Sequence, residues 1–383
     1  MHPVYVPSYL QFVVKITKFC NLRCRYCYEY PYLADPTRMS LSQLEQMFLH
    51  IAEHYQKNPN LTILDFIWHG GEPFVIKPSE YQAIYALQQQ IFEPLNIEIL
   101  NKVQTNLTLL DDTYIYALKN GLFDSIGVSI DLFGGDRVNR AGKCVEAKIL
   151  HNMQRLADHG IQHGCITVLS RQTFEYVEKI YTFFDEIQTP CRFLPIYRTG
   201  FEGQQVDNGL ESLEIVNAYQ RIFETWLASE HATEVAPLSG YITTAMRVLQ
   251  QETCQKVVYE RRTSDTLFIV NTDGETYCTD EVYDKKASYG NLFEQPFETL
   301  LTSVGYNQAV ERAQFKMAAT CHQCPYWGAC IGYEMAESTI EQMYFNESGQ
   351  LECRVVKPII TYIKERLLEE NMVEHLRFRA IID

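Results

Sequence analysis

Residues 18–28 read Lys-Phe-Cys-Asn-Leu-Arg-Cys-Arg-Tyr-Cys-Tyr. This stretch contains the motif from which the fold and the function of the chain are predicted. Cys20, Cys24 and Cys27 follow the spacing C-x₃-C-x₂-C, which places three thiolates on one short loop. Three thiolates can hold a [4Fe–4S] cube and leave one iron without a protein ligand, where a small molecule can bind. The cysteine motifs of ferredoxins supply four ligands, and zinc knuckles usually have their cysteines in pairs. Neither type of motif matches this spacing well. The loop therefore predicts a cluster with one open iron.

A second motif, Trp68-His-Gly-Gly-Glu-Pro73, follows the cysteines. In this order the two motifs resemble the signatures of the radical S-adenosylmethionine (SAM) family, in which an aromatic residue such as Tyr26 precedes the third cysteine. The resemblance implies that the open iron chelates SAM and that an electron from the cluster cleaves it to give a 5′-deoxyadenosyl radical. It also assigns Gly70, Gly71 and Glu72 to the amino group of SAM, and Tyr26 to its adenine.

Three further polar residues stand where strands are expected to end. These are Gln104, Asn106 and Ser129, and the resemblance implies that they contact the ribose or the carboxylate of SAM. A second interpretation of Asn106 is a turn residue that satisfies its own backbone. His69 fits a structural histidine better than a ligand.

Composition bounds the class of protein. The chain has 383 residues, enough for two or three domains, with 46% hydrophobic and 21% charged residues. No apolar run approaches the roughly 20 residues of a spanning helix, and the amino terminus lacks a signal-peptide pattern, so we expect a cytoplasmic protein without a membrane partner. The formal charge of −15 argues against nucleic acid, because phosphate binding needs basic stripes. It is compatible with a basic peptide substrate, although a solvated acidic surface is the simpler explanation.

A second group of cysteines lies near the carboxyl end. Twelve cysteines in a reducing compartment favour metal binding over disulfides. Cys321, Cys324 and Cys330 follow C-x₂-C-x₅-C, and Cys353 lies further on. Four thiolates can close the coordination of a whole [4Fe–4S] cluster or form a tetrahedral zinc site, and the spacing alone favours neither. The region resembles the SPASM extension of radical SAM enzymes, which implies an auxiliary [4Fe–4S] cluster on these four cysteines.

The SPASM pattern is incomplete in this chain. Glu334 stands four residues after Cys330, where the pattern has a cysteine of another auxiliary cluster. The upstream region offers only Cys254 and Cys278 as further ligands. Two thiolates do not hold a cube without help, so we expect one auxiliary cluster, with Glu334 as an oxygen donor at most.

The first two-thirds of the chain alternates short β-like runs with amphipathic helices. Strands are expected at 12–16, 61–67, 97–103, 125–130, 164–169 and 191–196, and helices at 40–55, 79–92, 111–120, 147–159 and 173–187. Six β–α units in series predict an α/β fold with a parallel sheet. The cysteine loop, the Gly-Gly-Glu-Pro turn, Gln104-Thr-Asn106 and Ser129-Ile-Asp131 all follow or close strands, and parallel folds build their sites at these carboxyl ends.

The pattern does not separate an open sheet from a curved one. The resemblance implies a partial (β/α)6 TIM-like radical SAM barrel over residues 1–235 and a cysteine-rich SPASM-type extension over 236–383. After about residue 200 we expect a helix at 211–229, a hinge at 234–240, a hairpin of 266–271 with 275–278, and a final helix at 357–370.

Longer stretches resemble maturases that build cyclophanes in ribosomally made, Gly-rich repeat precursor peptides. They are Ser129–Gly142, Ile166–Arg171, Arg192–Tyr197 with Phe201–Gly203, Ile269–Gly274 and Tyr289–Pro296. The resemblance implies abstraction of a Cβ hydrogen, attack of the carbon radical on an aromatic ring, and an oxidation that restores aromaticity. It implies a precursor peptide and a reducing protein such as flavodoxin or ferredoxin as partners. Asp280 and Glu281 are candidate bases, although two exposed hairpin acids fit the sequence as well.

Two other functions are consistent with the sequence. One is a different peptide chemistry on the same scaffold, either thioether formation or the oxidation of a cysteine or serine to formylglycine. The other is a zinc-stabilised binding protein without catalysis, which the intact cysteine triad and the Gly-Gly-Glu-Pro turn disfavour. Iron and acid-labile sulfide analysis after anaerobic purification separates these classes.

Overall fold

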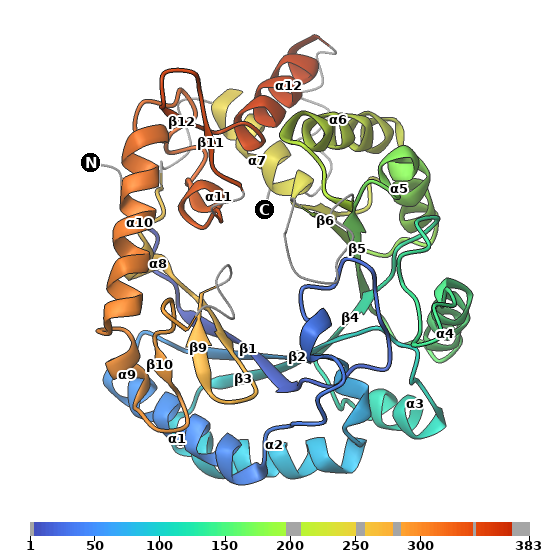
Figure 1. Ribbon diagram of the computed structural model, residues 1–383, viewed down its shortest axis with the longest axis vertical. Helices are drawn as coiled ribbons and strands as arrows, with labels where there is room; N and C mark the ends of the chain where they lie inside the picture. The colour runs from blue at the N-terminus through green and yellow to red at the C-terminus, as the bar shows by residue number, and fades with distance from the viewer. Residues whose placement is uncertain (1–3, 197–207, 250–256, 279–284, 340–341, 370–383) are drawn as a thin grey trace.

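The computed structural model describes residues 4–196, 208–249, 257–278, 285–339 and 342–369. Its elements form a ring, with the strands on the inside and the helices on the outside (Figure 1). The main sheet has ten strands in the order β10-β9-β8-β1-β2-β3-β4-β5-β6-β7. These strands are β1 (Tyr9–Thr17), β2 (Ile63–Gly70), β3 (Glu98–Thr105), β4 (Ser125–Ser129), β5 (Gly164–Leu169), β6 (Cys191–Pro195), β7 (Val235–Ala236), β8 (Leu267–Val270), β9 (Glu275–Tyr277) and β10 (Gly290–Asn291).

Strands β1 to β7 pair in parallel, so the predicted parallel α/β sheet is confirmed. Five helices connect the first six strands as expected, each within a few residues of its predicted bounds. The helices of the structure are α1 (Leu41–Lys57), α2 (Pro78–Phe92), α3 (Asp112–Lys119), α4 (Glu146–Asp158), α5 (Val177–Glu186), α6 (Ser212–Ala228), α7 (Leu238–Leu249), α8 (Arg261–Ser264), α9 (Phe297–Leu300), α10 (Val304–Thr320), α11 (Tyr333–Ala336) and α12 (Val356–Glu369).

Local sequence fixes where helices begin. Ser40 precedes α1 and accepts a hydrogen bond from the backbone N–H of Gln43, whose side chain accepts from the N–H of Ser40. Asp111 caps α3 by accepting from the N–H of Tyr114 at 2.8 Å. Short polar side chains satisfy amides that a helix leaves unpaired at its start, so both helices begin where the sequence predicts.

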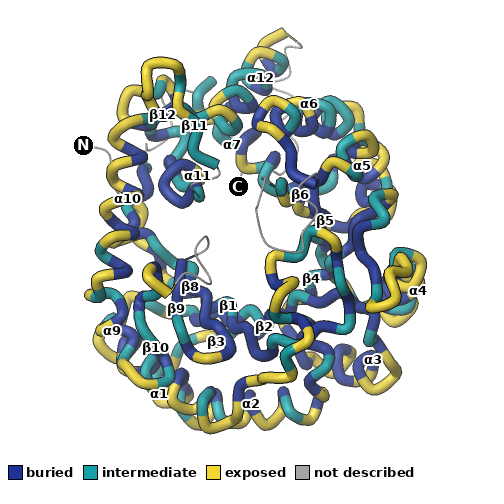
Figure 2. The backbone as a smooth tube through the Cα atoms, viewed as in Figure 1, coloured by how far each residue is buried: buried dark blue, intermediate teal, exposed yellow. Residues whose placement is uncertain are grey.

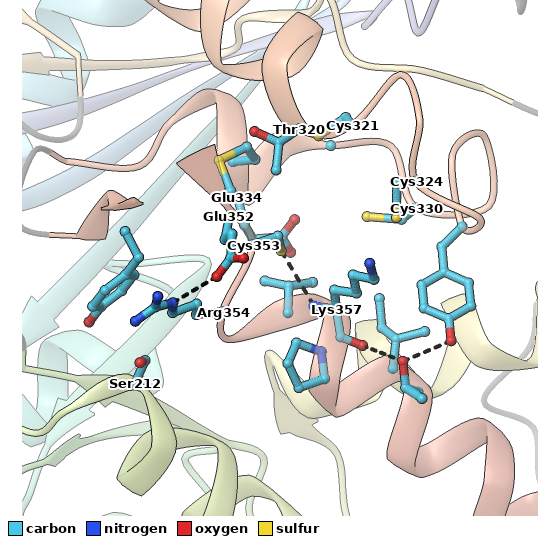
Figure 3. Close-up of a pocket in the computed structure, with 18 of the residues that line it drawn as sticks. Ser212, Thr320, Cys321, Cys324, Cys330, Glu334, Glu352, Cys353, Arg354 and Lys357 are labelled. Atoms are coloured by element: carbon cyan, nitrogen blue, oxygen red, sulfur yellow. Dashed lines mark hydrogen bonds and ion pairs between the residues drawn. The ribbon is translucent and has the colours of Figure 1, made fainter. Parts of the chain in front are cut away.

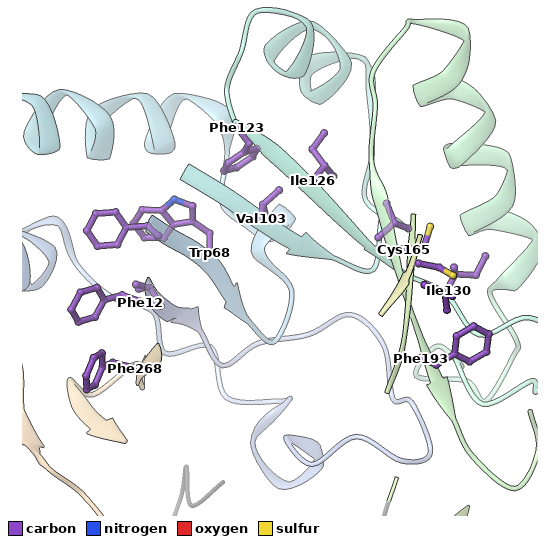
Figure 4. Close-up of a cluster of buried hydrophobic side chains, with 14 of the residues drawn as sticks. Phe12, Trp68, Val103, Phe123, Ile126, Ile130, Cys165, Phe193 and Phe268 are labelled. Carbon is purple, nitrogen blue, oxygen red and sulfur yellow. The ribbon is translucent and has the colours of Figure 1, made fainter. Parts of the chain in front are cut away.

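Apolar side chains alternate with polar ones along the central strands. Phe12, Trp68, Val103 and Ile126 come from four successive strands and lie in one layer between the sheet and the helices (Figure 4). Figure 2 shows the same division, because the strands are largely buried while the outer faces of the helices are exposed. Side chains on the other face of the sheet point into the ring. There Lys102 Nζ and Gln11 Nε2 both lie 2.6 Å from the same carboxylate oxygen of Asp65, so the inner face is polar.

The segment after residue 235 continues the sheet at both edges. The predicted hinge over 234–240 is wrong, because Val235 is fully buried in β7, which pairs with β6, and α7 follows at once. The predicted hairpin is confirmed as β8 and β9, which pair in antiparallel fashion. The sequence did not indicate that β8 also pairs in parallel with β1.

A separate small hairpin completes the cysteine-rich region. It consists of β11 (Tyr344–Phe345) and β12 (Leu351–Glu352) and lies near α10, α11 and α12 in Figure 1. The predicted final helix is confirmed as α12. In the described part of the chain, no helix is long and apolar enough to cross a membrane.

Candidate functional site

The three-cysteine loop follows β1 at the carboxyl edge of the parallel strands. Cys20 and Cys24 are buried and Cys27 is half-buried. The backbone N–H of Cys27 donates to the carbonyl of Cys24 at 3.1 Å, and that of Cys20 to Leu33 at 3.1 Å. Burial, followed by the nearby Glu72 carboxylate, raises the pKa of the Cys20 thiol to about 12. A buried thiolate therefore needs a compensating cation, and an iron–sulfur cluster supplies one while fitting a set of three sulfur donors.

The Gly-Gly-Glu-Pro turn packs directly on this loop. The N–H of Gly71 donates to the carbonyl of Thr17 at 2.8 Å, and the N–H of Glu72 to that of Phe19 at 2.9 Å. A Cβ atom at Gly71 would lie 2.2 Å from the carbonyl oxygen of Phe19, which is closer than atoms can approach. Glycine is therefore required here because backbone meets backbone at the edge of the cysteine loop.

We expect Gly71→Ala to displace the cysteine loop, because the new methyl group meets only backbone atoms, which have no room to move away. A shift of about 1 Å can cost about 10²-fold in rate, so deoxyadenosine formation from SAM should fall by about that factor. Gly240→Ala is the matched control, since its Cβ meets nothing within 4 Å. Iron content and deoxyadenosine yield measured together check the prediction, and wild-type values for both in Gly71→Ala would contradict it.

Glu72 is held by three hydrogen bonds from the protein. Its Oε1 accepts from the Thr105 hydroxyl at 2.6 Å and from the N–H of Phe74 at 2.9 Å, and its Oε2 accepts from the N–H of Asn106 at 2.8 Å. An ionised carboxylate has about four acceptor sites, so one remains on Oε2 for an ammonium group. Burial raises the pKa of Glu72, and the three donors oppose that shift by favouring the charged form.

Asn106, Gln104 and Ser129 lie near the same edge of the sheet. The Asn106 amide donates to Asn21 Oδ1 at 3.0 Å and approaches Cys20 Sγ at 3.7 Å. The side-chain oxygen Oδ1 of Asn106 accepts a hydrogen bond from the backbone N–H of Thr108. This is the turn geometry of the second interpretation that the sequence allows for Asn106. Gln104 Nε2 donates to Ser129 Oγ at 2.7 Å across neighbouring strands. All three therefore belong to one polar edge beside the cysteine loop.

Sequence reasoning missed a buried group beside Tyr26. The Tyr26 hydroxyl donates to Asp131, which also forms an ion pair with Arg137 at 2.8 Å. The Arg137 guanidinium lies over the Tyr26 ring, 5.7 Å from its centroid. Both charged residues are at least nine-tenths buried. The available signal was a charged residue between two apolar ones, Asp131 between Ile130 and Leu132; Arg137 lies between Asp136 and Val138 and carries no such signal.

A second buried ion pair lies on the inner face of the sheet. Lys15 Nζ is 2.6 Å from Glu29 Oε1, and both side chains are almost fully buried. His69 on β2 is opposite Lys15 in the strand register, and its Nδ1 accepts from the N–H of Gly70 at 2.7 Å. Burial, followed by the Lys15 cation, lowers the pKa of His69 to about 4, so its imidazole is neutral at pH 7. This agrees with the expectation of a structural histidine.

His69 gives the folded state a defined pH dependence. Its pKa is about 4 when folded and about 6.5 when unfolded, so the unfolded chain binds more protons between these values. The contribution to stability is therefore complete above about pH 6.5 and is lost as the pH falls towards 4. We expect a loss of about 1 kcal/mol between pH 7 and pH 5.5 from this group. Denaturant unfolding at the two pH values checks it against His69→Gln, whose pH dependence should be flatter by that amount.

The second cysteine group lines one cavity of about 1170 Å³. Cys321, Cys324, Cys330 and Cys353 all line it, together with Glu334 (Figure 3). The end of α10, the start of α12 and the small hairpin bring them together. Burial raises the pKa of Cys321, Cys330 and Cys353, and each further thiol nearby adds to the shift. Among the described residues no three His, Cys, Asp or Glu side chains are arranged to hold a single metal ion. Four thiols around one cavity are, by their chemistry, a donor set that suits an iron–sulfur cluster with no open position.

Two further predicted residues lie in different surroundings, and three others lie outside the described residues. Glu334 shares the four-cysteine cavity, whereas Cys278 belongs to the apolar core that includes Tyr289. Cys278 is not among the residues that line the cavity with Glu334. Cys254 and the candidate bases Asp280 and Glu281 lie outside the described residues.

Comparison with known proteins gives a consistent result. A sequence model of the radical SAM superfamily matches residues 14–184. A serine-type anaerobic sulfatase-maturating enzyme of Bacteroides thetaiotaomicron is 23% identical over 86% of this chain and 83% of its own. The structure of native anSMEcpe with bound AdoMet and Cp18Cys peptide aligns with a TM-score of 0.74, 19% identity, and coverage of 96% and 100% of the two chains. The structure of Streptococcus suis SuiB bound to S-adenosylmethionine aligns with a TM-score of 0.56 and 14% sequence identity. The alignment covers 91% of this chain and 77% of the SuiB chain. These structural likenesses show the fold.

Proposed function

We propose that this chain, which is a radical SAM enzyme, oxidises a peptide or protein substrate at a Cβ carbon. The observation that carries the proposal is the pair of cysteine sites in one fold. Three cysteines at the edge of the sheet leave room for SAM, and four cysteines close a second site in the cysteine-rich region. One site suits radical generation and the other suits removal of the second electron. We propose residues 1–235 for the first task and 236–383 for the second.

The chain's own residues bind and orient SAM in this proposal. When bound, the cluster and SAM supply a 5′-deoxyadenosyl radical that removes a hydrogen atom from carbon. Glu72 Oε2 takes the ammonium of SAM, and Gly70 and Gly71 let the backbone approach it. Gln104, Asn106 and Ser129 contact the ribose or carboxylate, and Tyr26 contacts the adenine.

The substrate then lies on the inner face of the sheet. This face is polar and holds its charges in pairs, as Lys15 with Glu29 and Lys102 with Asp65 show. Paired charges leave no net charge to attract water or stray ions to the carbon radical. Asp280 or Glu281 accepts the proton that leaves the substrate. An electron from a flavodoxin or ferredoxin starts each cycle.

The finer proposal is a cyclophane crosslink in a ribosomally made precursor peptide. The Cβ radical attacks an aromatic ring of a nearby residue, and the ring regains aromaticity by loss of a proton and one electron. A cluster held by Cys321, Cys324, Cys330 and Cys353 would supply the acceptor for that electron. The crosslink removes two hydrogens in total. This proposal is supported by the sequence stretches that resemble cyclophane-forming maturases, which cover both halves of the chain.

A second candidate is formylglycine formation on a cysteine or serine of a protein substrate. It also begins with loss of a Cβ hydrogen and one further electron. The relatives named above favour it, because the Bacteroides thetaiotaomicron protein is a serine-type sulfatase-maturating enzyme. Thioether formation is a third outcome of the same first step and differs by consuming a thiol.

Anaerobic co-expression with the short open reading frame nearest the gene tests these proposals. A cyclophane should appear as a loss of two hydrogens, no backbone fragmentation between the linked residues, and unchanged thiol alkylation. A thioether loses one alkylatable thiol, and formylglycine forms an adduct with a hydrazide reagent. An unmodified precursor, combined with a hydrazide-reactive sulfatase peptide in the same assay, would replace the cyclophane proposal with the second candidate.

A further inference from the structure

We propose that Arg137 is the fixed cation of the three-cysteine site, that Asp131 and Tyr26 hold it in place, and that it favours one-electron reduction of the cluster bound there. The inference rests on the cluster of the proposed function but not on the nature of the substrate. Arg137 is a positioning and tuning residue in this proposal, which assigns it no contact with SAM or peptide.

The backbone sets Arg137 opposite one of the cysteines. The N–H of Arg23 donates to the carbonyl of Val138 at 2.7 Å, and the N–H of Arg25 donates to that of Asp136 at 3.0 Å. Leu22 and Asn139 form an antiparallel bridge in the same register. This register places Cys24 directly opposite Arg137, between two hydrogen-bonded positions. Side chains are closest at such pairs, with Cβ atoms about 4.5–5.5 Å apart.

The Arg137 guanidinium is held in a fixed position by Asp131. Arg137 Nε lies 2.8 Å from Asp131 Oδ2, which also accepts from the Tyr26 hydroxyl. Asp131 Oδ1 accepts from the backbone N–H of Val168 at 2.7 Å, so the carboxylate is anchored to β5. Arg137 is 8% exposed and Asp131 is 2% exposed. A cation in this position cannot swing into water, and solvent does not screen it.

The pair is oriented with its positive end towards the cysteine loop. Arg137 is the residue opposite Cys24 in the register, whereas the Asp131 carboxylate is bound on its other side to the N–H of Val168 on β5. Tyr26 lies between Cys24 and Cys27 in the loop, and its ring faces the guanidinium. A cluster held by these thiolates gains one negative charge on reduction. A fixed positive end nearby in a low-dielectric site stabilises that charge.

Other cations near the loop are less suited to this role. Arg23 is half-buried and donates to the carbonyls of Cys20 and Leu22. Arg25 and Arg140 are exposed, so water and salt screen their charges. Lys15 is also buried and paired, with Glu29 at 2.6 Å, but in the strand register it lies opposite His69 and not opposite a cysteine.

The test is a redox titration of the full chain with reconstituted clusters, monitored by EPR, in a Cys330→Ala/Cys353→Ala background, which leaves only two thiolates in the second site, so that the three-cysteine cluster gives the signal. In Arg137→Gln the ratio of reduced to oxidised cluster at a given potential should fall about tenfold, which is about 59 mV for one electron. Arg137→Lys should recover most of the shift. Arg25→Gln is the matched control, with an expected change of less than about twofold, because it removes an exposed charge from the same loop.

A second variant distinguishes an effect of charge from an effect of misfolding. Asp131→Asn removes the anion and leaves the cation, so the midpoint should move in the opposite direction, to less negative potential. An Arg137→Gln protein with full iron and an unchanged midpoint would overturn the proposal, and so would equal shifts in both variants. The titration contains no peptide. Its outcome is therefore independent of whether the precursor is crosslinked, and an unmodified precursor with the expected shifts would count against the proposed function alone.

Discussion

Replacing Cys24 with alanine is expected to abolish SAM cleavage. Cys24 is buried in the three-cysteine loop, and two thiolates with one methyl group do not hold a [4Fe–4S] cube. The iron content should fall by about four per chain, and deoxyadenosine should no longer form after addition of dithionite. Iron analysis and chromatography of the nucleoside products measure the two effects on the same preparation.

The control for this change is Cys144→Ala, because the Cys144 thiol is exposed and belongs to neither cysteine group. Its iron content and deoxyadenosine yield should match the wild type. Deoxyadenosine formation by Cys24→Ala at the wild-type rate would show that the loop does not hold the catalytic cluster.

Replacing Cys353 with alanine is expected to separate radical formation from product formation. Cys353 lines the four-cysteine cavity, and its Sγ accepts from the N–H of Lys357 at the start of α12. Without this thiolate three cysteines remain, and because no SAM is proposed to cap the open iron at this site, the cluster should be labile and up to about four irons per chain should be lost. SAM cleavage should continue, because the three-cysteine loop is intact. Modified peptide should fall below detection, because the second electron has no acceptor.

Deoxyadenosine and modified peptide are quantified together in this experiment, by chromatography and mass spectrometry. The matched control is Glu352→Gln, a neighbouring cavity residue whose carboxylate is paired with Arg354 at 3.0 Å. Its iron content should be unchanged. Wild-type product yield from an iron-depleted Cys353→Ala protein would mean that another acceptor removes the electron.

Local features were predictable because short-range interactions decide them. The capping box of Ser40 and Gln43 needs only four residues, and the sequence placed the start of α1 correctly. The alternation of apolar and polar residues gave the central strands, since a strand buries one face against helices. One proline and one glycine in 234–240 suggested a hinge, yet the partner that makes Val235 a strand residue is Cys191 on β6, far away in the chain.

The candidate site divides in the same way. Glu72 was identified from its motif, but its three donors come from Phe74, Thr105 and Asn106, and only the pairing of β2 with β3 brings the last two close. Asp131 stood in a noted motif, yet its role depends on Arg137 and Tyr26, from different loops. No local pattern indicates an ion pair that forms across such distances.

By itself, the sequence determined the order of β–α units, the two groups of cysteines and the glycine-rich turn, because helix caps, strand alternation and ligand spacing act over a few residues. Tertiary structure decided that β8 joins β1, that four cysteines meet in one cavity, and that a buried arginine faces Cys24. These depend on the pairing register and packing of segments distant along the chain, which are settled by the free energy of the whole fold rather than of any one segment.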